Sequence, residues 1–398
     1  MADPRLYLPP VLSDESTRKL VSDLSLPDPT TVKPLITTAA YHTIYLITFA
    51  ADDASALHPA QTDKDGSVSL ILRVAGKHIP RIKTLNEVAA MTWVRKNCKI
   101  PIPAVIRFDA SENNVIGHEF TLLERVRGVS IDTIYDTLDD AKIAHLVGQL
   151  TNYLTELHRH EWTHAGGLSI GEGGGEIVPG RILAENFWQG PEIAQFWGDG
   201  ESIDSLNVRG PFGSYTEYLR GHIQQYIQNI EKHDSLEWMR DMIPRLRDFL
   251  DFVDARAAEL NDTKYILTHK DLHFGNVMCD PETLEITSVL DWEFAAVLPL
   301  PLWNPGGGFL WSAKDESEAS FAERDRLFKD IFTKICAERD PALLADFDVK
   351  NKEPHREIAK VLNFTRAIVQ VCPRGQKLET AETTWRSTVE NALHDLGI

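Results

Sequence analysis

The sequence predicts an α+β fold with two lobes, a β-rich N-terminal lobe followed by a larger, mainly helical C-terminal lobe. Short runs of β-branched and aromatic residues, bounded by Asp, Asn, Gly or Pro, occupy the first third of the 398 residues. Apolar residues at helical spacing dominate after about residue 128. Apolar residues make up 43% of the chain, which is enough for a sizeable core. We place the two lobes at residues 1–124 and 125–398.

The N-terminal lobe is expected to be a sheet with one long helix. A short leading helix around residues 20–24 can be capped by Ser13 or Asp14. Residues 83–97 (KTLNEVAAMTWVRKN) are rich in helix formers and end before two prolines, which helices do not tolerate in their interior. The expected strands are residues 41–49, 68–75, 104–108 and 119–126.

The C-terminal lobe is expected to be helical with a small β insert. Its first helix, residues 139–160, repeats Leu, Ile and Val at helical spacing between Ile143 and Leu157. A glycine cluster at 166–175 lacks the G-K-[ST] ending of a P-loop, and we interpret it as a flexible hairpin. Further helices are expected at residues 214–232, 236–260, 316–339, 355–371 and 380–396, and strands at 265–268, 277–278 and 284–290.

Composition excludes several classes of protein. The 41 basic and 59 acidic residues give a net charge of −18, so a nucleic-acid partner is not expected. The chain lacks the run of about 18–20 apolar residues that a membrane helix needs, and its start does not resemble a secretory signal. Four widely separated cysteines suit a reducing compartment. We therefore expect a cytoplasmic protein with no membrane partner; no feature indicates its oligomeric state.

The most informative stretch is residues 265–299, which contains four polar residues at a defined spacing. His269-x-Asp271-x-x-x-x-Asn276 is followed after fifteen residues by Asp291. Residues 280–283 (DPET) would form the turn of a hairpin whose second strand brings Asp291 to the end where Asn276 lies. Phosphoryl transfer needs hard oxygen ligands for magnesium and a carboxylate that accepts the proton of the attacking hydroxyl. The spacing matches that of protein kinases.

These motifs, THKDLHFGNV followed by VLDWE, resemble the aminoglycoside phosphotransferase family. The resemblance implies a protein-kinase-like two-lobe fold and the use of ATP and Mg²⁺. It implies that Asp271 is the catalytic base, that Asn276 and Asp291 are magnesium ligands, and that His269 supports the catalytic loop. Lys270 departs from the glycine usual in the family; it could contact the transferring phosphate or point to solvent, and we favour solvent.

The N-terminal lobe supplies a second part of the same resemblance. Arg73 lies in an expected strand and Glu87 in the following helix, which is where such enzymes place a phosphate-binding cation and its paired carboxylate. The segment TLLERVRG resembles the family's crossover, in which the backbone of Glu124 and Val126 would bind an adenine. The phosphate-covering segment TTAAYHTIY contains no glycine; Thr37, Thr38 and the backbone at 39–41 could still donate to phosphate.

The acceptor is expected to be a hydroxylated small molecule, because the A-P-E pattern of protein kinases is absent. An acidic pocket formed by Glu293 or residues 315–318 (DESE) would suit an aminoglycoside-like amine, although a solvated charge run explains DESE better. His158 and Trp292 are expected to be packing residues. Residues 166–180 and 209–219 resemble fungal members. The predicted function is an ATP- and Mg²⁺-dependent O-phosphotransferase; the alternative is a catalytically silent kinase-like nucleotide- or ligand-binding protein.

Overall fold

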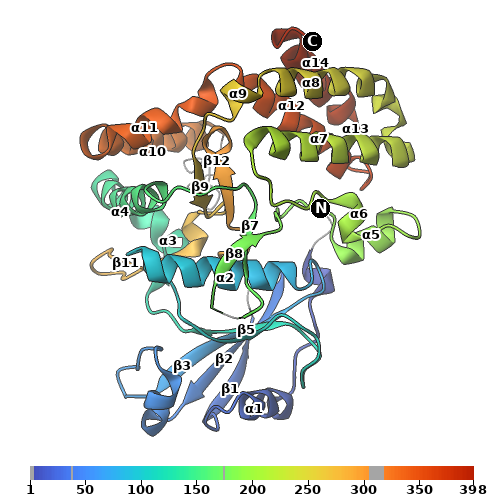
Figure 1. Ribbon diagram of the computed structural model, residues 1–398. Coiled ribbons are helices and arrows are strands. Elements are labelled where there is room, and N and C mark those ends of the chain that lie inside the picture. Colours follow the sequence, from blue (N-terminus) through green and yellow to red (C-terminus); the bar gives the residue numbers. More distant parts are fainter. Residues whose placement is uncertain (1–3, 37–38, 174, 304–317) are drawn as a thin grey trace.

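The computed structural model describes residues 4–36, 39–173, 175–303 and 318–398 and shows two lobes (Figure 1). The smaller lobe holds a five-stranded antiparallel sheet with the order β1-β2-β3-β5-β4. Ser13 caps the leading helix, as expected, by accepting a hydrogen bond from the Ser16 N–H. The elements of this lobe are α1 (Asp14–Asp23), β1 (Thr31–Leu35), β2 (His42–Phe49), β3 (Val68–Ala75), α2 (Ile82–Asn97), β4 (Val105–Asp109) and β5 (Phe120–Glu124).

The edge strand β1 was not expected from the sequence. It pairs antiparallel with β2 from Thr31 opposite Thr48 to Leu35 opposite Ile44. Pro34 lies within it, and proline has no N–H to donate to a neighbouring strand, so the run was not recognised as a strand. An edge strand tolerates this loss because it has a neighbour on one side only. The four strands that were expected are all present.

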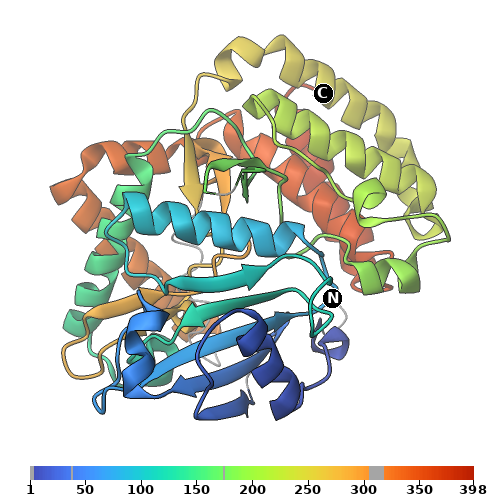
Figure 2. The ribbon, with the colours of Figure 1, turned by 60° about the horizontal axis from the view of Figure 1, so that its bottom comes forward.

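Helix α2 lies between the sheet and the large lobe (Figures 1 and 2). Ala89, Met91 and Val94 on this helix belong to the hydrophobic core of the large lobe, whereas α1 packs on a separate core of the sheet. The side chain of Asn86 also anchors the helix to the large lobe by hydrogen bonds. Its Nδ2 donates to the carbonyls of Glu293 (3.0 Å) and Ala295 (2.9 Å), and its Oδ1 accepts from the Leu168 N–H (2.7 Å).

The large lobe is mainly helical. Asp139 and Ser214 cap α4 and α7 by accepting hydrogen bonds from the N–H groups of Lys142 and Glu217. The expected helix 236–260 is divided into a 3₁₀ segment, Asp234–Met242, and two α-helices, because Pro244 fits the first turn of a new helix. The helices are α3 (Ile131–Ile134), α4 (Asp140–His158), α5 (Gly190–Phe196), α6 (Ile203–Leu206), α7 (Tyr215–Lys232), α8 (Ile243–Ala255), α9 (Ala257–Leu260), α10 (Glu318–Arg339), α11 (Pro341–Phe347), α12 (His355–Val371), α13 (Leu378–Thr380) and α14 (Arg386–Asp395).

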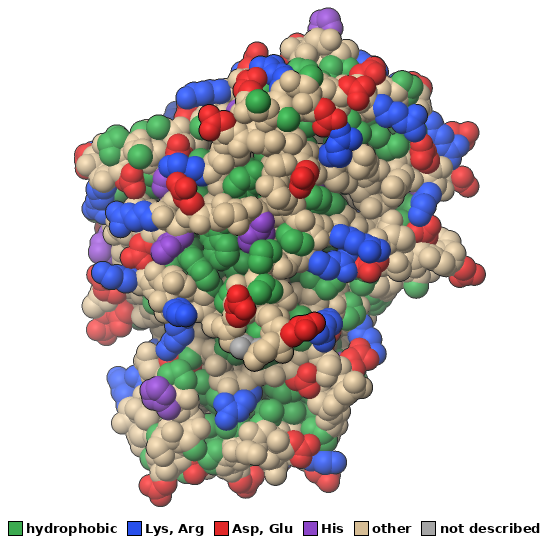
Figure 3. All heavy atoms as spheres, in the orientation of Figure 1, with side chains coloured by type: hydrophobic (Ala, Val, Ile, Leu, Met, Phe, Trp, Pro, Cys, Tyr) green, Lys and Arg blue, Asp and Glu red, His purple; other side chains and the backbone are tan. Residues whose placement is uncertain are grey.

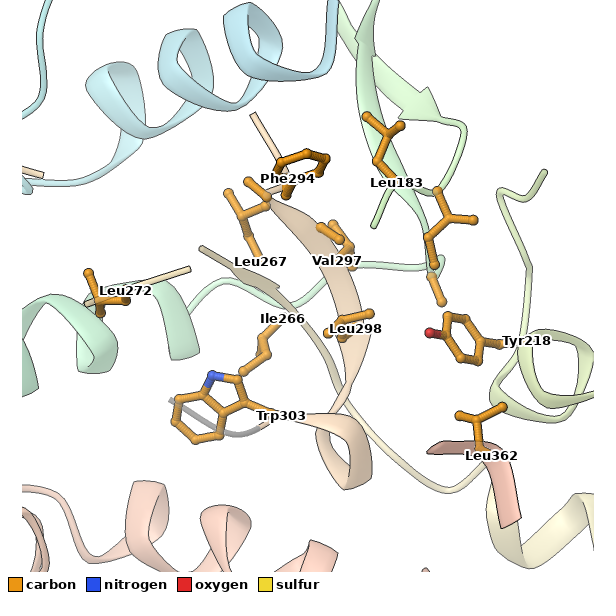
Figure 4. Close-up of a cluster of buried hydrophobic side chains, with 14 of the residues drawn as sticks. Leu183, Tyr218, Ile266, Leu267, Leu272, Phe294, Val297, Leu298, Trp303 and Leu362 are labelled. Atoms are coloured by element: carbon orange, nitrogen blue, oxygen red, sulfur yellow. The ribbon is translucent and has the colours of Figure 1, made fainter. Parts of the chain in front are cut away.

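Three small sheets lie where the lobes meet. The glycine cluster forms the β7–β8 hairpin, β9 pairs with β12, and β10 lies between β6 and β11. These strands are β6 (Val129–Ser130), β7 (Gly167–Ile170), β8 (Ile177–Gly180), β9 (Tyr265–Thr268), β10 (Val277–Cys279), β11 (Ile286–Val289) and β12 (Ala296–Pro299). Their side chains are part of the large core, which continues into α7 and α12 (Figure 4).

Among the described residues, no helix combines the length and the apolar character needed to cross a bilayer. On the face seen in Figure 3, acidic and basic side chains are interspersed over both lobes. His158 lies inside, with Nε2 2.9 Å from Oδ2 of Asp346 and its ring stacked on Trp303, which confirms it as a packing residue.

Candidate active site

The β10–β11 hairpin brings the two expected magnesium ligands together. Val277 pairs with Val289, and the N–H of Leu290 donates to the carbonyl of Asn276 at 2.7 Å. Asp291 follows directly, so it lies at the same end of the hairpin as Asn276. At the other end, Oδ1 of Asp280 accepts two backbone N–H groups and closes the expected turn. The hairpin geometry is therefore as the sequence predicted.

Asp271 lies beside this hairpin on the loop that follows β9. Nδ2 of Asn276 donates to the Asp271 backbone carbonyl (3.0 Å) and to its Oδ2 (3.1 Å), and Nε2 of His273 lies 3.5 Å from the same oxygen. Burial works against ionisation of Asp271, but His273, His269 and Asn276 outweigh it and hold the pKa of this carboxyl below its usual value. Asp271 is thus a charged, partly accessible acceptor.

His269 is buried behind the loop and makes structural contacts. Its Nε2 donates to the carbonyl of Leu290 at 2.7 Å, and Nδ1 lies 3.3 Å from the N–H of Asp271. Its ring packs edge-on against Trp292, a core residue as expected, with centroids 4.6 Å apart. Burial lowers the pKa of His269, so the ring is neutral and can accept at Nδ1. The residue links the loop to the end of β11.

Arg73 on β3 connects the sheet to the hairpin. Its Nη1 pairs with Oε1 of Glu87 on α2, and its Nη2 lies 3.3 Å from Oδ1 of Asp291. Glu87 is 1% exposed, whereas a third of the Asp291 side chain is accessible. Asp291 also has φ = 63°, a left-handed conformation that is uncommon outside glycine and typical of functional sites. The structure therefore brings together Arg73, Glu87 and Asp291.

A buried polar network behind this cluster was not recognised in the sequence. Nζ of Lys83 donates to Oε2 of Glu293 (2.7 Å) and lies 3.0 Å from Nε2 of His42, while Nη2 of Arg73 lies 3.2 Å from Nδ1 of the same histidine. Burial, then Arg73 and Lys83, lower the pKa of His42. Burial raises the pKa of Glu293 to about 7, and Lys83 opposes the rise. These residues come from three distant segments, so no local spacing marks them.

The donor set fits a divalent cation, because Mg²⁺ prefers carboxylate and amide oxygens. The amide nitrogen of Asn276 is committed to Asp271, which leaves its Oδ1 as an acceptor. Asp291 contributes an accessible carboxylate 3.3 Å from a permanent cation. Among the described residues no cluster of three His, Cys, Asp or Glu side chains is arranged around a common metal position, so this site would depend on the amide and on phosphate oxygens.

The expected adenine-binding segment follows β5. The Glu124 carboxylate is buried and accepts hydrogen bonds from the N–H groups of Gln61 (3.2 Å) and Ala104 (3.0 Å), which fixes the segment to the sheet. The N–H of Glu124 donates to the Ala104 carbonyl at 2.9 Å. Val126 lies two residues on, beyond the sheet. Thr37 and Thr38 of the expected phosphate-covering segment lie outside the described residues.

Lys270 is exposed, in keeping with the expectation that it points to solvent, but its ammonium also contacts the protein. Its Nζ donates to the carbonyl of Leu183 at 2.6 Å, and its accessible surface faces a cavity of about 1410 Å³ that Asp271 also lines. Its φ is 68°, a conformation that suits the glycine usual at this position. Desolvation by the surrounding protein lowers the pKa of Lys270 to about 8. The charge of Arg366 adds to this shift, and that of Glu185 opposes it.

Of the residues expected to form an acidic pocket, Glu293 is the one whose side chain the structure describes, and it does not line the cavity. Glu293 is 2% exposed, and its carboxylate accepts a hydrogen bond from Lys83. Residues 315–317 of the DESE run lie outside the described part of the chain. Sequence reasoning failed here because Glu293 lies only two residues from Asp291, and its pairing with the distant Lys83 on α2 is visible only in the folded chain.

The fold and site define the class of protein to which the chain belongs. Residues 47–300 match the model of the phosphotransferase enzyme family, and the chain is a member of that family. The α+β, protein-kinase-like two-lobe fold predicted from the sequence is confirmed.

The curated relatives are fungal. A subtelomeric hrmA-associated cluster protein of Aspergillus fumigatus is 23% identical over 267 residues, covering 54% of this chain and 50% of that protein. Clavilactone A biosynthesis cluster protein Y of Ampulloclitocybe clavipes is 23% identical over 222 residues, with the same coverage. The chain therefore spans about half the length of the curated relatives it matches.

Two solved structures of aminoglycoside phosphotransferases align with most of the chain. The gentamicin complex of APH(2″)-IIa is 13% identical, covers 97% of this chain and 96% of that one, and has a TM-score of 0.45. A thermostable mutant of the aminoglycoside phosphotransferase APH(4)-Ia in its apo form is 13% identical, covers 95% and 98%, and has a TM-score of 0.47.

Proposed function

We propose that the protein is an ATP- and Mg²⁺-dependent O-phosphotransferase that acts on a hydroxylated small molecule. The observation that carries the proposal is the juxtaposition of Asp271, Asn276 and Asp291 at one end of the β10–β11 hairpin, with Arg73 reaching Asp291 from the other lobe. This arrangement provides a base, a pair of hard oxygen ligands and a permanent cation, which are the parts that phosphoryl transfer requires.

Each residue has a defined task in this proposal. Asp271 accepts a hydrogen bond from the acceptor hydroxyl, orients it and takes its proton as the new O–P bond forms. The bond between the γ-phosphorus and the bridging oxygen breaks, and ADP leaves with that oxygen. Asn276 and Asp291 would hold Mg²⁺, which supplies charge neutralisation on the phosphates. Arg73, held by Glu87, orients the α- and β-phosphates, and the backbone at Glu124 and Val126 binds the adenine edge.

The test is the melting temperature of the protein with and without ATP plus Mg²⁺. A ligand that binds only the folded state at a hundredfold excess over its Kd adds about 2.7 kcal/mol of stability. We expect a magnesium-dependent rise in the wild type and none in Asp291→Asn, which tolerates the left-handed backbone but loses the charge. The control is Asp280→Asn, which keeps the hairpin turn. Absence of a rise in the wild type would reject the proposal.

The same purified protein can be used to distinguish the proposed enzyme from the alternative, a catalytically silent binding protein. A silent binding protein would show the rise in melting temperature but would release no ADP with any acceptor or with water. Sustained ADP release that disappears in Asp291→Asn would exclude a silent protein.

A further inference from the structure

The cavity beside Asp271 has a positive lining in an acidic protein. The whole chain carries a net charge of −18. Among the described residues that line the cavity, basic side chains outnumber carboxylates by six to three. The basic residues are Lys270, Lys329, Lys350, Arg356, Lys360 and Arg366, and the acidic ones are Glu185, Asp271 and Asp348. A polycationic acceptor would meet like charge here, and an anion would be attracted.

Two of these cations are already neutralised by helix neighbours. Arg356 pairs with Glu353 at 2.6 Å and with Glu357 at 2.7 Å, and Lys360 pairs with Glu357 at 2.9 Å. Glu357 is buried, so these pairs are fixed parts of α12. They add little attraction for a ligand.

Arg366 lies further along α12 and, unlike Arg356 and Lys360, is not paired with a carboxylate of the described residues. Its Nε atom is buried without a hydrogen-bond partner, and in the described part of the chain the side chain has no ion pair. A guanidinium presents five N–H donors, and leaving buried donors unmatched is costly. Only Nε is buried, since the Arg366 side chain as a whole is partly exposed at the cavity, so its other donors are available to a ligand there.

Lys270 supplies a second cation to the lining of the same cavity. Its ammonium has three donors, of which one is used by the Leu183 carbonyl at 2.6 Å. Arg366 lies close enough for the two charges to disfavour one another, and Glu185 is the carboxylate that partly offsets them. An oxyanion between Lys270 and Arg366 would remove this repulsion and satisfy the free donors of both.

Much of the remaining lining is aromatic and apolar. Tyr218 on α7 projects its hydroxyl toward Leu298 on β12, and Trp303 and Leu362 lie around the same space (Figure 4). His222 donates its Nδ1 proton to the Tyr218 carbonyl at 2.8 Å, because a carbonyl can only accept. The cavity therefore combines apolar walls with two cations near the base.

We propose that the acceptor is an anionic alcohol, whose hydroxyl faces Asp271, whose apolar body packs on these walls and whose oxyanion, such as a carboxylate, binds between Lys270 and Arg366. This substrate class rests on the proposed phosphotransferase function. It differs from the aminoglycoside-like amine that the sequence suggested.

Three benzyl alcohols that differ in one substituent test the proposal. They are 4-(hydroxymethyl)benzoate, its neutral amide and 4-(hydroxymethyl)benzylamine, titrated calorimetrically into the full chain with ADP and Mg²⁺. We expect the benzoate to bind at least about tenfold more tightly than the amide, the scale of one charge-assisted pair. Arg366→Gln should abolish this preference. Arg356→Gln, which removes a cavity guanidinium that is already paired, should retain it. Lys270→Asn, which suits the left-handed backbone, is a second test should Arg366→Gln fail to fold.

The outcomes separate the two proposals. Arg366-dependent binding of the benzoate supports the anion site, and it does so even if ATP with Mg²⁺ does not raise the melting temperature, a result that would reject the phosphotransferase function alone. Tighter binding of the amine, or ADP release with the amine only, would overturn the anion site and leave the phosphotransferase intact. Benzoate binding that is absent at millimolar concentration, or that persists unchanged in Arg366→Gln and Lys270→Asn, would also overturn it.

Discussion

Arg73 and Asp291 are 218 residues apart in the sequence, yet Nη2 of the arginine lies 3.3 Å from Oδ1 of the aspartate. The same guanidinium pairs with the buried Glu87 on α2. Arg73 therefore joins the sheet, the helix and the hairpin that carries the proposed metal ligands. A cation in this position has two uses, because it can orient phosphate oxygens and it holds the Asp291 carboxylate in place.

Replacement of Arg73 by Met should weaken ATP binding by about tenfold or more, because one charge-assisted interaction is worth about 1.5–3 kcal/mol. The measurement is the Kd for ATP with Mg²⁺. The control is Arg107→Met on the exposed face of β4, where the guanidinium bonds a backbone carbonyl. Equal affinity in wild type and Arg73→Met would remove Arg73 from the nucleotide site.

Asp271→Asn should lower kcat by about 10²–10⁴-fold, the usual contribution of a positioned general base. Nucleotide affinity should stay close to that of the wild type, since Asp271 is not assigned to the metal. Single-turnover ADP release together with ATP binding measures both quantities, and Asp280→Asn is the control. A folded Asp271→Asn protein that retains full turnover, or one that loses ATP binding as well, would contradict the assigned role.

Lys83→Met should destabilise the protein by about 3 kcal/mol, the cost of leaving one member of a buried ion pair without its partner. Lys83 is 1% exposed and donates to Glu293, which is 2% exposed. Lys77→Met, which removes an exposed lysine paired with Glu112, should cost less than about 1 kcal/mol. Urea unfolding compares the two; equal and small effects would show that the buried pair contributes nothing.

The buried ring of His222 should make the protein sensitive to acid. Burial is the main cause that lowers its pKa from 6.5 to about 4, with Lys270 and Arg366 adding to the shift. The folded state therefore keeps the ring neutral while the unfolded chain takes up a proton below pH 6.5. The stabilising contribution is complete above that pH and falls as the pH drops toward 4, by up to about 3 kcal/mol.

Comparison with His222→Gln isolates this contribution from that of other groups. The free energy of unfolding, measured at pH 7 and pH 4.5, should fall more steeply in the wild type than in the variant. Parallel pH dependence in the two proteins would show that His222 titrates normally.

The sequence predicted the hairpin and its three polar residues because they lie within about twenty residues of one another. Their spacing reflects local geometry, since a strand, a turn and a returning strand bring Asn276 and Asp291 together. Arg73 and Glu87 could be predicted from their order on a strand and the following helix, and the structure places them in contact.

Features that depend on distant segments could not be predicted in the same way. Lys83 and His42 meet Glu293 only after the sheet has packed on the large lobe. Arg366 lies on an amphipathic helix, and nothing in its periodicity distinguishes a cavity cation from a surface cation. Nothing near Lys270 in the sequence indicated that this exposed residue would line the same cavity as Arg366, which lies 96 residues further on.

The three hydrogen bonds of Asn86 have a consequence for regulation. Protein kinases are controlled in part by moving the helix that carries the glutamate partner of the phosphate-binding cation. Here the corresponding helix, α2, is anchored to Glu293, Ala295 and Leu168 of the large lobe and shares its core. Withdrawing Glu87 would break all three bonds, at a net cost of about 1 kcal/mol each, and would also expose core residues. In the proposed phosphotransferase, α2 would therefore stay in place, and turnover would follow the supply of substrates and the abundance of the chain.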